Sequence, residues 1–170
     1  KYKVIGTSLY NLAFPLIRDK INKKIIINIC GSKSDGIDLL NEYINYLSLK
    51  KNVNLNLDIS QNSKNNYYLS SDLLITPSYM EGFGNSSLEA MSFGCPVLVS
   101  RFGASPEVVG DTGYIINDIS AKAIAKVIQD YSQLSYNIKL RMRTKAFNRA
   151  HSKFSFERKL SSFKKIINES

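Results

Sequence analysis

The chain has 170 residues, of which 44% are hydrophobic, and it carries a formal net charge of +9 at neutral pH. This length allows one domain with a sizeable core, and the hydrophobic content is ordinary for a soluble globular protein. Because no apolar run approaches the roughly 20 residues that span a bilayer and no signal peptide is apparent, we expect a cytoplasmic protein rather than a membrane-spanning one.

The first third of the chain alternates apolar runs with amphipathic segments. We expect strands at residues 2–5, 24–30 and 52–59, and helices at 9–21 and 35–49. The run at 24–30 is continuously apolar, which is typical of a strand buried on both faces. The helix that follows it has a single apolar stripe, formed by Ile37, Leu40, Ile44 and Leu47.

The rest of the chain continues the alternation. A polar loop at 60–64 and a short helix at 65–70 lead to a strand at 73–76, which Pro77 ends because proline cannot donate to a sheet. After a glycine loop and a helix come strands at 96–99 and 113–117, a helical turn at 106–109, and helices beginning at Ser120, Asn137 and Phe154. This order predicts a single α/β domain over residues 1–170, with a Rossmann-like parallel sheet of about six strands and helices on both faces.

The strand, loop and helix over residues 73–94 carry the functional signal. Glu81 lies in the loop and Glu89 lies in the helix, with seven residues between them. In an open parallel sheet such a loop lies at the carboxyl edge of the strands, where ligands bind, and the helix start attracts phosphate. Carboxylates accept strong hydrogen bonds from sugar hydroxyls, so a nucleotide-sugar would fit this site.

Each of these residues also has a purely structural interpretation. Ser86 and Glu89 have the spacing of a capping box, in which Glu89 would only reach back to the helix start. Glu81 could be a solvated loop carboxylate. The loop glycines could serve a turn with positive φ, and the three residues after them could be simple caps: Gly82 and Gly84, then Asn85, Ser86 and Ser87.

The segment resembles the Glu-x7-Glu signature of retaining glycosyltransferases with the GT-B fold, in the large family four. The resemblance depends on four sequence segments: PSYMEGFG, LEAMSFGCPVLVS, GASPEVV and GYIIN. It spans nearly the whole chain and is specific between Ser71 and Asn117. It is a likeness to the C-terminal domain, which binds the donor. We therefore expect the acceptor-binding domain to be absent from this chain, as in an excised domain or a split enzyme, and the isolated domain to be inactive.

The resemblance implies a role for each residue. Glu89 would bind the ribose of a UDP- or GDP-sugar, and Glu81 would be the catalytic residue beside the transferred hexose. Gly82, Phe83 and Gly84 would let the backbone approach the donor, and Asn85, Ser86 and Ser87 would face its phosphates. The base would lie near Asp58, Ile59 and Ser60. The chain has no metal-ligand cluster and no Asp-x-Asp triad, so we expect no metal and no further cofactor.

The implied function is glycan or polysaccharide biosynthesis on a saccharide or lipid-linked acceptor. One departure from the family favours a degenerate, non-catalytic scaffold or partner-binding module. The family usually carries an Arg after the first strand and a Lys at the next helix, whereas here Gly6 is followed by Thr7 and the nearest basic residues are Arg18 and Lys20. An epimerase would need catalytic histidines, and His151 is the only histidine. We expect no nucleic-acid partner because no recognised binding motif is present.

The remaining expectations concern charge and cysteines. The excess of positive charge reflects either a Lys-, Asn- and Ile-rich composition, which we favour, or peripheral contact with an anionic membrane through the basic segment 139–159. Cys30 and Cys95 are the only cysteines, and both adjoin apolar strands. We expect two buried, reduced thiols.

Overall fold

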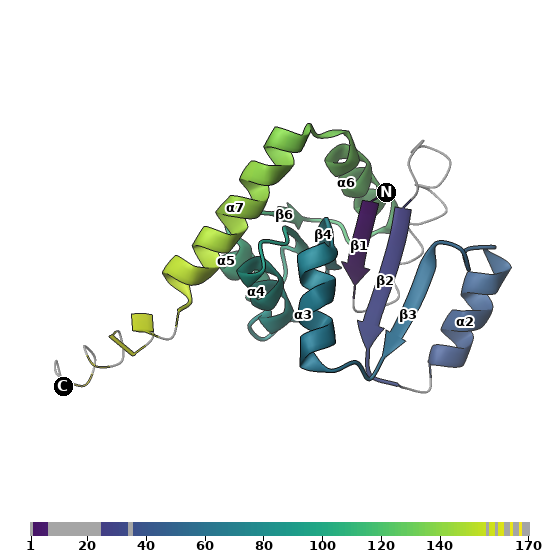
Figure 1. The fold of residues 1–170 in the computed structure, drawn as a ribbon, viewed down its shortest axis with the longest axis horizontal. Helices are drawn as coiled ribbons and strands as arrows, with labels where there is room; N and C mark the ends of the chain where they lie inside the picture. The colour runs from purple at the N-terminus through teal and green to yellow at the C-terminus, as the bar shows by residue number, and fades with distance from the viewer. Residues whose placement is uncertain are drawn as a thin grey trace.

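The structure is a computed structural model that describes residues 2–6, 25–33 and 36–155, together with residues 157, 158, 160, 161, 164 and 167. Six parallel strands form one sheet in the order β3-β2-β1-β4-β5-β6 (Figure 1). The strand order reverses between β1 and β4, which is where ligands bind in doubly wound sheets. The strands are β1 Tyr2–Gly6, β2 Ile25–Gly31, β3 Val53–Leu57, β4 Leu73–Thr76, β5 Val97–Ser100 and β6 Tyr114–Ile116.

Helices connect most of these strands. Serine side chains begin three of them, because the Oγ atoms of Ser60, Ser120 and Ser135 each accept a hydrogen bond from an amide in the first turn. The helix α7 packs along α4 (Figure 1). The described helices are α2 Ile37–Tyr46, α3 Gln61–Ser70, α4 Asn85–Ser92, α5 Ser105–Val109, α6 Ala121–Gln133 and α7 Tyr136–Lys153.

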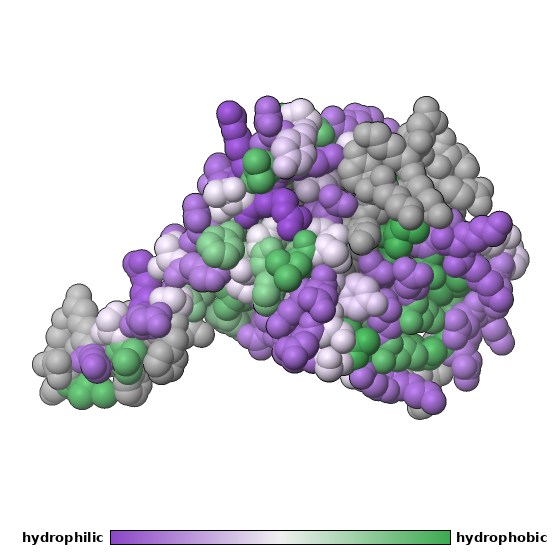
Figure 2. All heavy atoms as spheres, viewed as in Figure 1, coloured by the Kyte–Doolittle hydropathy of each residue, from purple (hydrophilic) through white to green (hydrophobic). Residues whose placement is uncertain are grey.

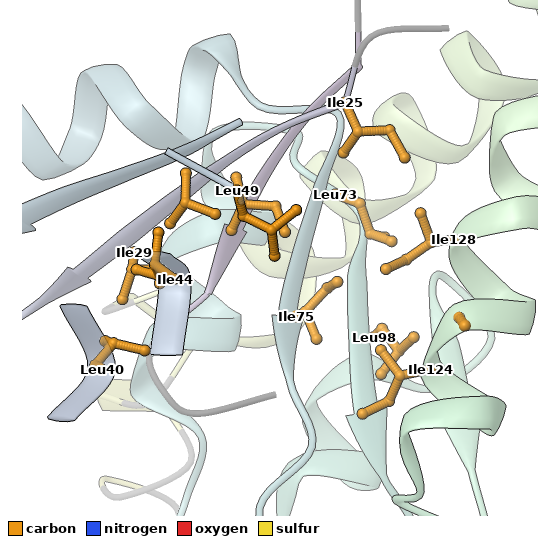
Figure 3. Close-up of a cluster of buried hydrophobic side chains, with 13 residues drawn as sticks. Ile25, Ile29, Leu40, Ile44, Leu49, Leu73, Ile75, Leu98, Ile124 and Ile128 are labelled. Atoms are coloured by element: carbon orange, nitrogen blue, oxygen red, sulfur yellow. The ribbon is translucent and has the colours of Figure 1, made fainter. Parts of the chain in front are cut away.

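The core has two halves, one on each face of the sheet. On the first face, aliphatic side chains of the strands pack against α2 and α6, for example Leu98 against Ile124 (Figure 3). We call this the α2–α6 face. On the second face, strand residues such as Leu74 and Val97 pack against α3, α4, α5 and α7, and the cluster includes Tyr68 and both cysteines. We call this the α3–α4 face.

The predicted fold class is therefore confirmed: a parallel sheet has helices on both faces. Several predicted boundaries are wrong. The segment 60–64 is not a loop, because Ser60 caps α3 and the helix begins at Gln61, four residues before the predicted start. The strand β3 ends at Leu57, since Asp58 has φ +50 and leaves the extended conformation. The predicted helix at 9–21 lies outside the described residues, as does much of the one at 154–167.

Both cysteines are free and buried, as predicted. Burial raises the pKa of the Cys30 thiol to about 11 and that of the Cys95 thiol to about 12. Both therefore stay protonated, and poorly reactive, near neutral pH.

The surface is mixed in character. Hydrophilic residues cover much of the face seen in Figure 2, and hydrophobic residues are exposed between them in separate patches. Within the part of the chain that the structure describes, no helix combines the length and the apolar character that crossing a bilayer requires.

Candidate functional site

The loop between β4 and α4 is held in place by the loop between β5 and α5. The amide of Ala104 donates to the carbonyl of Glu81 at 3.1 Å, and the Ser100 hydroxyl donates to the carbonyl of Ser78. Gly103 has φ +71, and a Cβ added there would lie 2.6 Å from the Glu81 carbonyl oxygen. The main chain of Glu81 is therefore tightly packed. Its side chain is half-buried, and its carboxylate makes no hydrogen bond or ion pair with any described residue.

Gly84 begins the helix α4 in a conformation that favours glycine. Its φ is +85, and an added Cβ would lie 3.0 Å from Ser105 Oγ. The helix starts at Asn85, so Ser86 lies inside it and cannot be its cap. The alternative interpretation of Ser86 and Glu89 as a capping box is wrong for this reason. Of the two loop glycines only Gly84 needs positive φ, because Gly82 has neither a positive φ nor a crowded Cβ position.

Glu89 turns toward α3 rather than toward its own helix start. Its Oε2 atom lies 2.8 Å from Lys64 Nζ and accepts a hydrogen bond from the Tyr68 hydroxyl at 3.2 Å. Tyr68 is 2% exposed, whereas 36% of the Glu89 side chain remains exposed. Burial raises the pKa of Tyr68, and the nearby Glu89 carboxylate raises it further, so the phenol stays a donor.

Two hollows adjoin this cluster. One, of about 240 Å³, lies at the carboxyl ends of β2 and β3 beside α3, and is lined by Cys30, Gly31, Ser32, Asp58, Ile59, Lys64 and Tyr68. The other, of about 390 Å³, lies between α4 and α7, and its lining includes Asn85 and Glu89. Lys64 and Tyr68 therefore connect the strand-end hollow to the Glu89 carboxylate.

The predicted base-proximal residues lie at or beside the strand-end hollow. Asp58 and Ile59 line it, and Asp58 also accepts a hydrogen bond from the amide of Lys33 at 3.1 Å, which ties the β2 and β3 ends together. Ser60 uses its hydroxyl to cap α3. Whether any of them contacts a base stays a prediction.

The other predicted donor residues divide by exposure. Asn85 is exposed and Ser86 is half-buried, but Ser87 is fully buried, so its hydroxyl does not face solvent. The Phe83 ring packs edge-on against Phe154, with ring centroids 6.1 Å apart.

Lys64 and Tyr68 were missed as site residues by sequence reasoning. They are four positions apart, so they share one face of a helix. The signal was hidden because the segment containing Lys64 was predicted to be a loop, which gave its side chain no direction.

No group of three or more His, Cys, Asp or Glu side chains that could hold a metal ion occurs among the described residues. The expectation that the site works without a metal remains a prediction, since a cation can also be held by a substrate's phosphates.

The family model described as glycosyl transferases group 1 matches residues 4–151. The chain belongs to this family. Curated proteins are also similar to this chain. O-antigen chain mannosyltransferase B of Escherichia coli is 44% identical to it over 69 residues, which cover 38% of this chain and 18% of that protein.

Solved structures share the fold. HepE of Anabaena, crystallised with UDP and glucose, matches all of this chain and 49% of its own with a TM-score of 0.82 at 18% identity. The C-terminal domain of LpcC, a glycosyl transferase group 1 family protein of Francisella tularensis, matches with a TM-score of 0.78 at 21% identity, over 92% of this chain and 87% of that domain. The chain thus spans about half of HepE but most of the separately solved C-terminal domain.

Proposed function

We propose that this chain is the donor-binding domain of a retaining hexosyltransferase that uses a nucleoside diphosphate sugar in glycan or polysaccharide biosynthesis. The carrying observation is the Glu89 carboxylate. It is partly accessible, it is linked through Lys64 and Tyr68 to a hollow at the strand ends, and it follows a glycine-bounded helix start. A pentose at Glu89 would leave room for the base over Asp58 and Ile59. The UDP bound by the similar HepE structure is consistent with this choice of ligand.

In this proposal Glu81 acts on the sugar that is transferred. Its carboxylate has no partner among the described residues and is free to bind hydroxyls. Its main chain is held in place by Ala104 and Gly103, so the side chain starts from a fixed backbone position. The bond from the anomeric carbon to the leaving diphosphate breaks as the acceptor oxygen bonds to the same face. The acceptor proton passes to the leaving phosphate oxygen. Such a reaction depends on positioning and electrostatics.

The acceptor site belongs, in this proposal, to a second domain like the remainder of the longer relatives. The acceptor would be a saccharide or a lipid-linked glycan, and this chain alone would bind donor with little or no transfer. Exposed basic residues of α7, among them Arg141, Lys145 and Lys153, would favour an anionic membrane surface during the reaction.

Calorimetric titration of the chain with UDP and GDP tests the proposal. We expect one of them to bind, and Glu89→Ala to weaken binding about tenfold to a hundredfold, since a hydrogen bond to a charged group contributes roughly 1.5–3 kcal/mol. Asp130→Ala is the matched control, because Asp130 is an exposed carboxylate on α6 that also pairs with a lysine. If the wild type and Glu89→Ala bind the nucleotide equally well, the proposed role of Glu89 in donor binding is refuted. In a separate titration, a nucleotide affinity that a metal chelator leaves unchanged would support a metal-free site.

The second candidate is a non-catalytic scaffold of the same fold. It is favoured by the sequence after the first strand, where Gly6 is followed by Thr7 instead of the family's usual Arg and no lysine follows shortly after. A scaffold predicts no heat of binding for either nucleotide or its sugar conjugates, so the same titration separates the two candidates.

A further inference from the structure

Two side chains of α3 contact one and the same oxygen of Glu89. Lys64 Nζ and Tyr68 Oη both lie within hydrogen-bond distance of Oε2, at 2.8 and 3.2 Å. No described residue makes a hydrogen bond or ion pair with the other oxygen, Oε1. The carboxylate is therefore held from one side and open on the other.

The holding residues differ in rigidity, and Tyr68 is the fixed one. Its ring is buried and stacks on Phe93, with centroids 6.2 Å apart, so its hydroxyl has a defined position. Lys64 is 30% exposed along its side chain, and it supplies positive charge to the same oxygen. Together they restrict the torsions of a glutamate that would otherwise sample several rotamers on the surface of α4.

We propose that Lys64 and Tyr68 are positioning residues, which hold Oε2 of Glu89 so that Oε1 accepts the ribose hydroxyls of the nucleotide. This inference rests on the proposed donor-binding function. An acceptor whose torsions are fixed in advance loses less entropy on binding, so ligands that carry the hydroxyls gain affinity. Ligands without them gain nothing from the arrangement.

A purely structural role makes a different prediction. If the two contacts only joined α3 to α4, or if Lys64 only attracted the diphosphate, their removal would change the affinity for every nucleotide by the same factor. The ratio of affinities for a ribonucleotide and its dideoxy counterpart isolates the positioning effect.

The experiment is calorimetric titration of the chain with UDP, GDP and their 2′,3′-dideoxy counterparts. Lys64→Met keeps the aliphatic stem, and Tyr68→Phe keeps the buried ring. For the better-bound nucleotide we expect each variant to lose about threefold to tenfold in affinity, which corresponds to one hydrogen bond of roughly 0.5–1.5 kcal/mol. For the dideoxy compound we expect less than a twofold change.

The chain offers matched controls for both variants. Lys126→Met removes a lysine that lies 3.0 Å from Asp130 on the surface of α6, and Tyr131→Phe removes the hydroxyl of a second buried tyrosine. Neither should alter the ribonucleotide-to-dideoxy ratio. Far-ultraviolet circular dichroism of each variant checks that it is folded.

The outcomes separate the inference from the function beneath it. If the wild type binds no nucleotide, the donor-binding function fails and the inference fails with it. If the wild type binds and depends on Glu89, but Lys64→Met and Tyr68→Phe leave the ribonucleotide-to-dideoxy ratio unchanged, the function stands and the positioning role is wrong.

Discussion

The two faces of the sheet differ in the kind of side chain that is buried between the strands and the helices. On the α2–α6 face the cluster of buried side chains is aliphatic (Figure 3), and the half-buried Tyr114 packs against it. On the α3–α4 face the cluster includes Tyr68, whose ring is in the core and whose hydroxyl reaches Glu89. Both faces therefore stabilise the fold, and the α3–α4 face also couples the core to the candidate site.

This difference has a physical origin. Aliphatic side chains carry no polar group that must be satisfied, so a layer made of them can be sealed by its helices. A buried tyrosine needs a partner for its hydroxyl, and here the partner is a carboxylate at the surface. Changes on the two faces should then have separable effects on stability and on nucleotide affinity.

The largest expected effect is on the α2–α6 face. Leu98→Ala should lower the free energy of unfolding by about 2–5 kcal/mol, because Leu98 is fully buried and the substitution leaves a cavity. Urea unfolding measures the loss, and Ile124→Val, expected to cost about 0.5–1.5 kcal/mol, serves if the first variant is poorly folded. Nucleotide affinity of the folded variant should stay within twofold of the wild type. A large loss of affinity would mean that the two faces are not separable.

A smaller effect is expected where the loops of the candidate site meet. Gly103→Ala should cost about 1–2 kcal/mol or more, because φ there is +71 and the new Cβ would overlap the Glu81 main chain. It should also abolish any advantage in affinity of the nucleotide-sugar over the nucleotide, since Glu81 is displaced. Gly36→Ala is the control, as nothing lies within 4 Å of its Cβ position and its φ is −83. Unchanged stability of Gly103→Ala would show that the main chains of Gly103 and Glu81 are not tightly packed against each other.

The smallest effect concerns the cysteines of the α3–α4 face. The pKa of Cys95 is raised by burial to about 12 from an unperturbed 9.0, so above pH 9 the unfolded chain loses a proton that the folded chain keeps. This contribution to stability is complete below pH 9 and is lost as the pH rises toward 12. Between pH 8 and pH 10 the wild type should lose about 1 kcal/mol more than Cys95→Ala. Parallel pH profiles of urea unfolding for the two proteins would contradict the assignment.

Much of the fold was predictable because it depends on local patterns. The apolar run at β2 and the apolar stripe of α2 each report burial through their own periodicity. Boundaries failed where one side chain decided them. Because Ser60 caps α3, the helix begins four residues before its predicted start. The strand β3 ends before Asp58, because the backbone of Asp58 has a positive φ.

The candidate site was predictable only in part. The spacing and sequence context of Glu81 and Glu89 marked both carboxylates, and the resemblance to a family suggested their roles. The sequence could not say which way Glu89 points, because the capping box and a ligand contact use the same residues. Nor could it select Lys64 from the other lysines of the chain.

The sequence by itself determined which segments are buried, that they alternate as strands and helices, and that two carboxylates flank a glycine loop. These properties follow from interactions among near neighbours along the chain. Only the tertiary structure decided that Glu89 meets residues 21 and 25 positions before it, on a different helix. The reason is that a side-chain contact between two helices depends on the packing of both against the sheet, and no local pattern encodes that geometry.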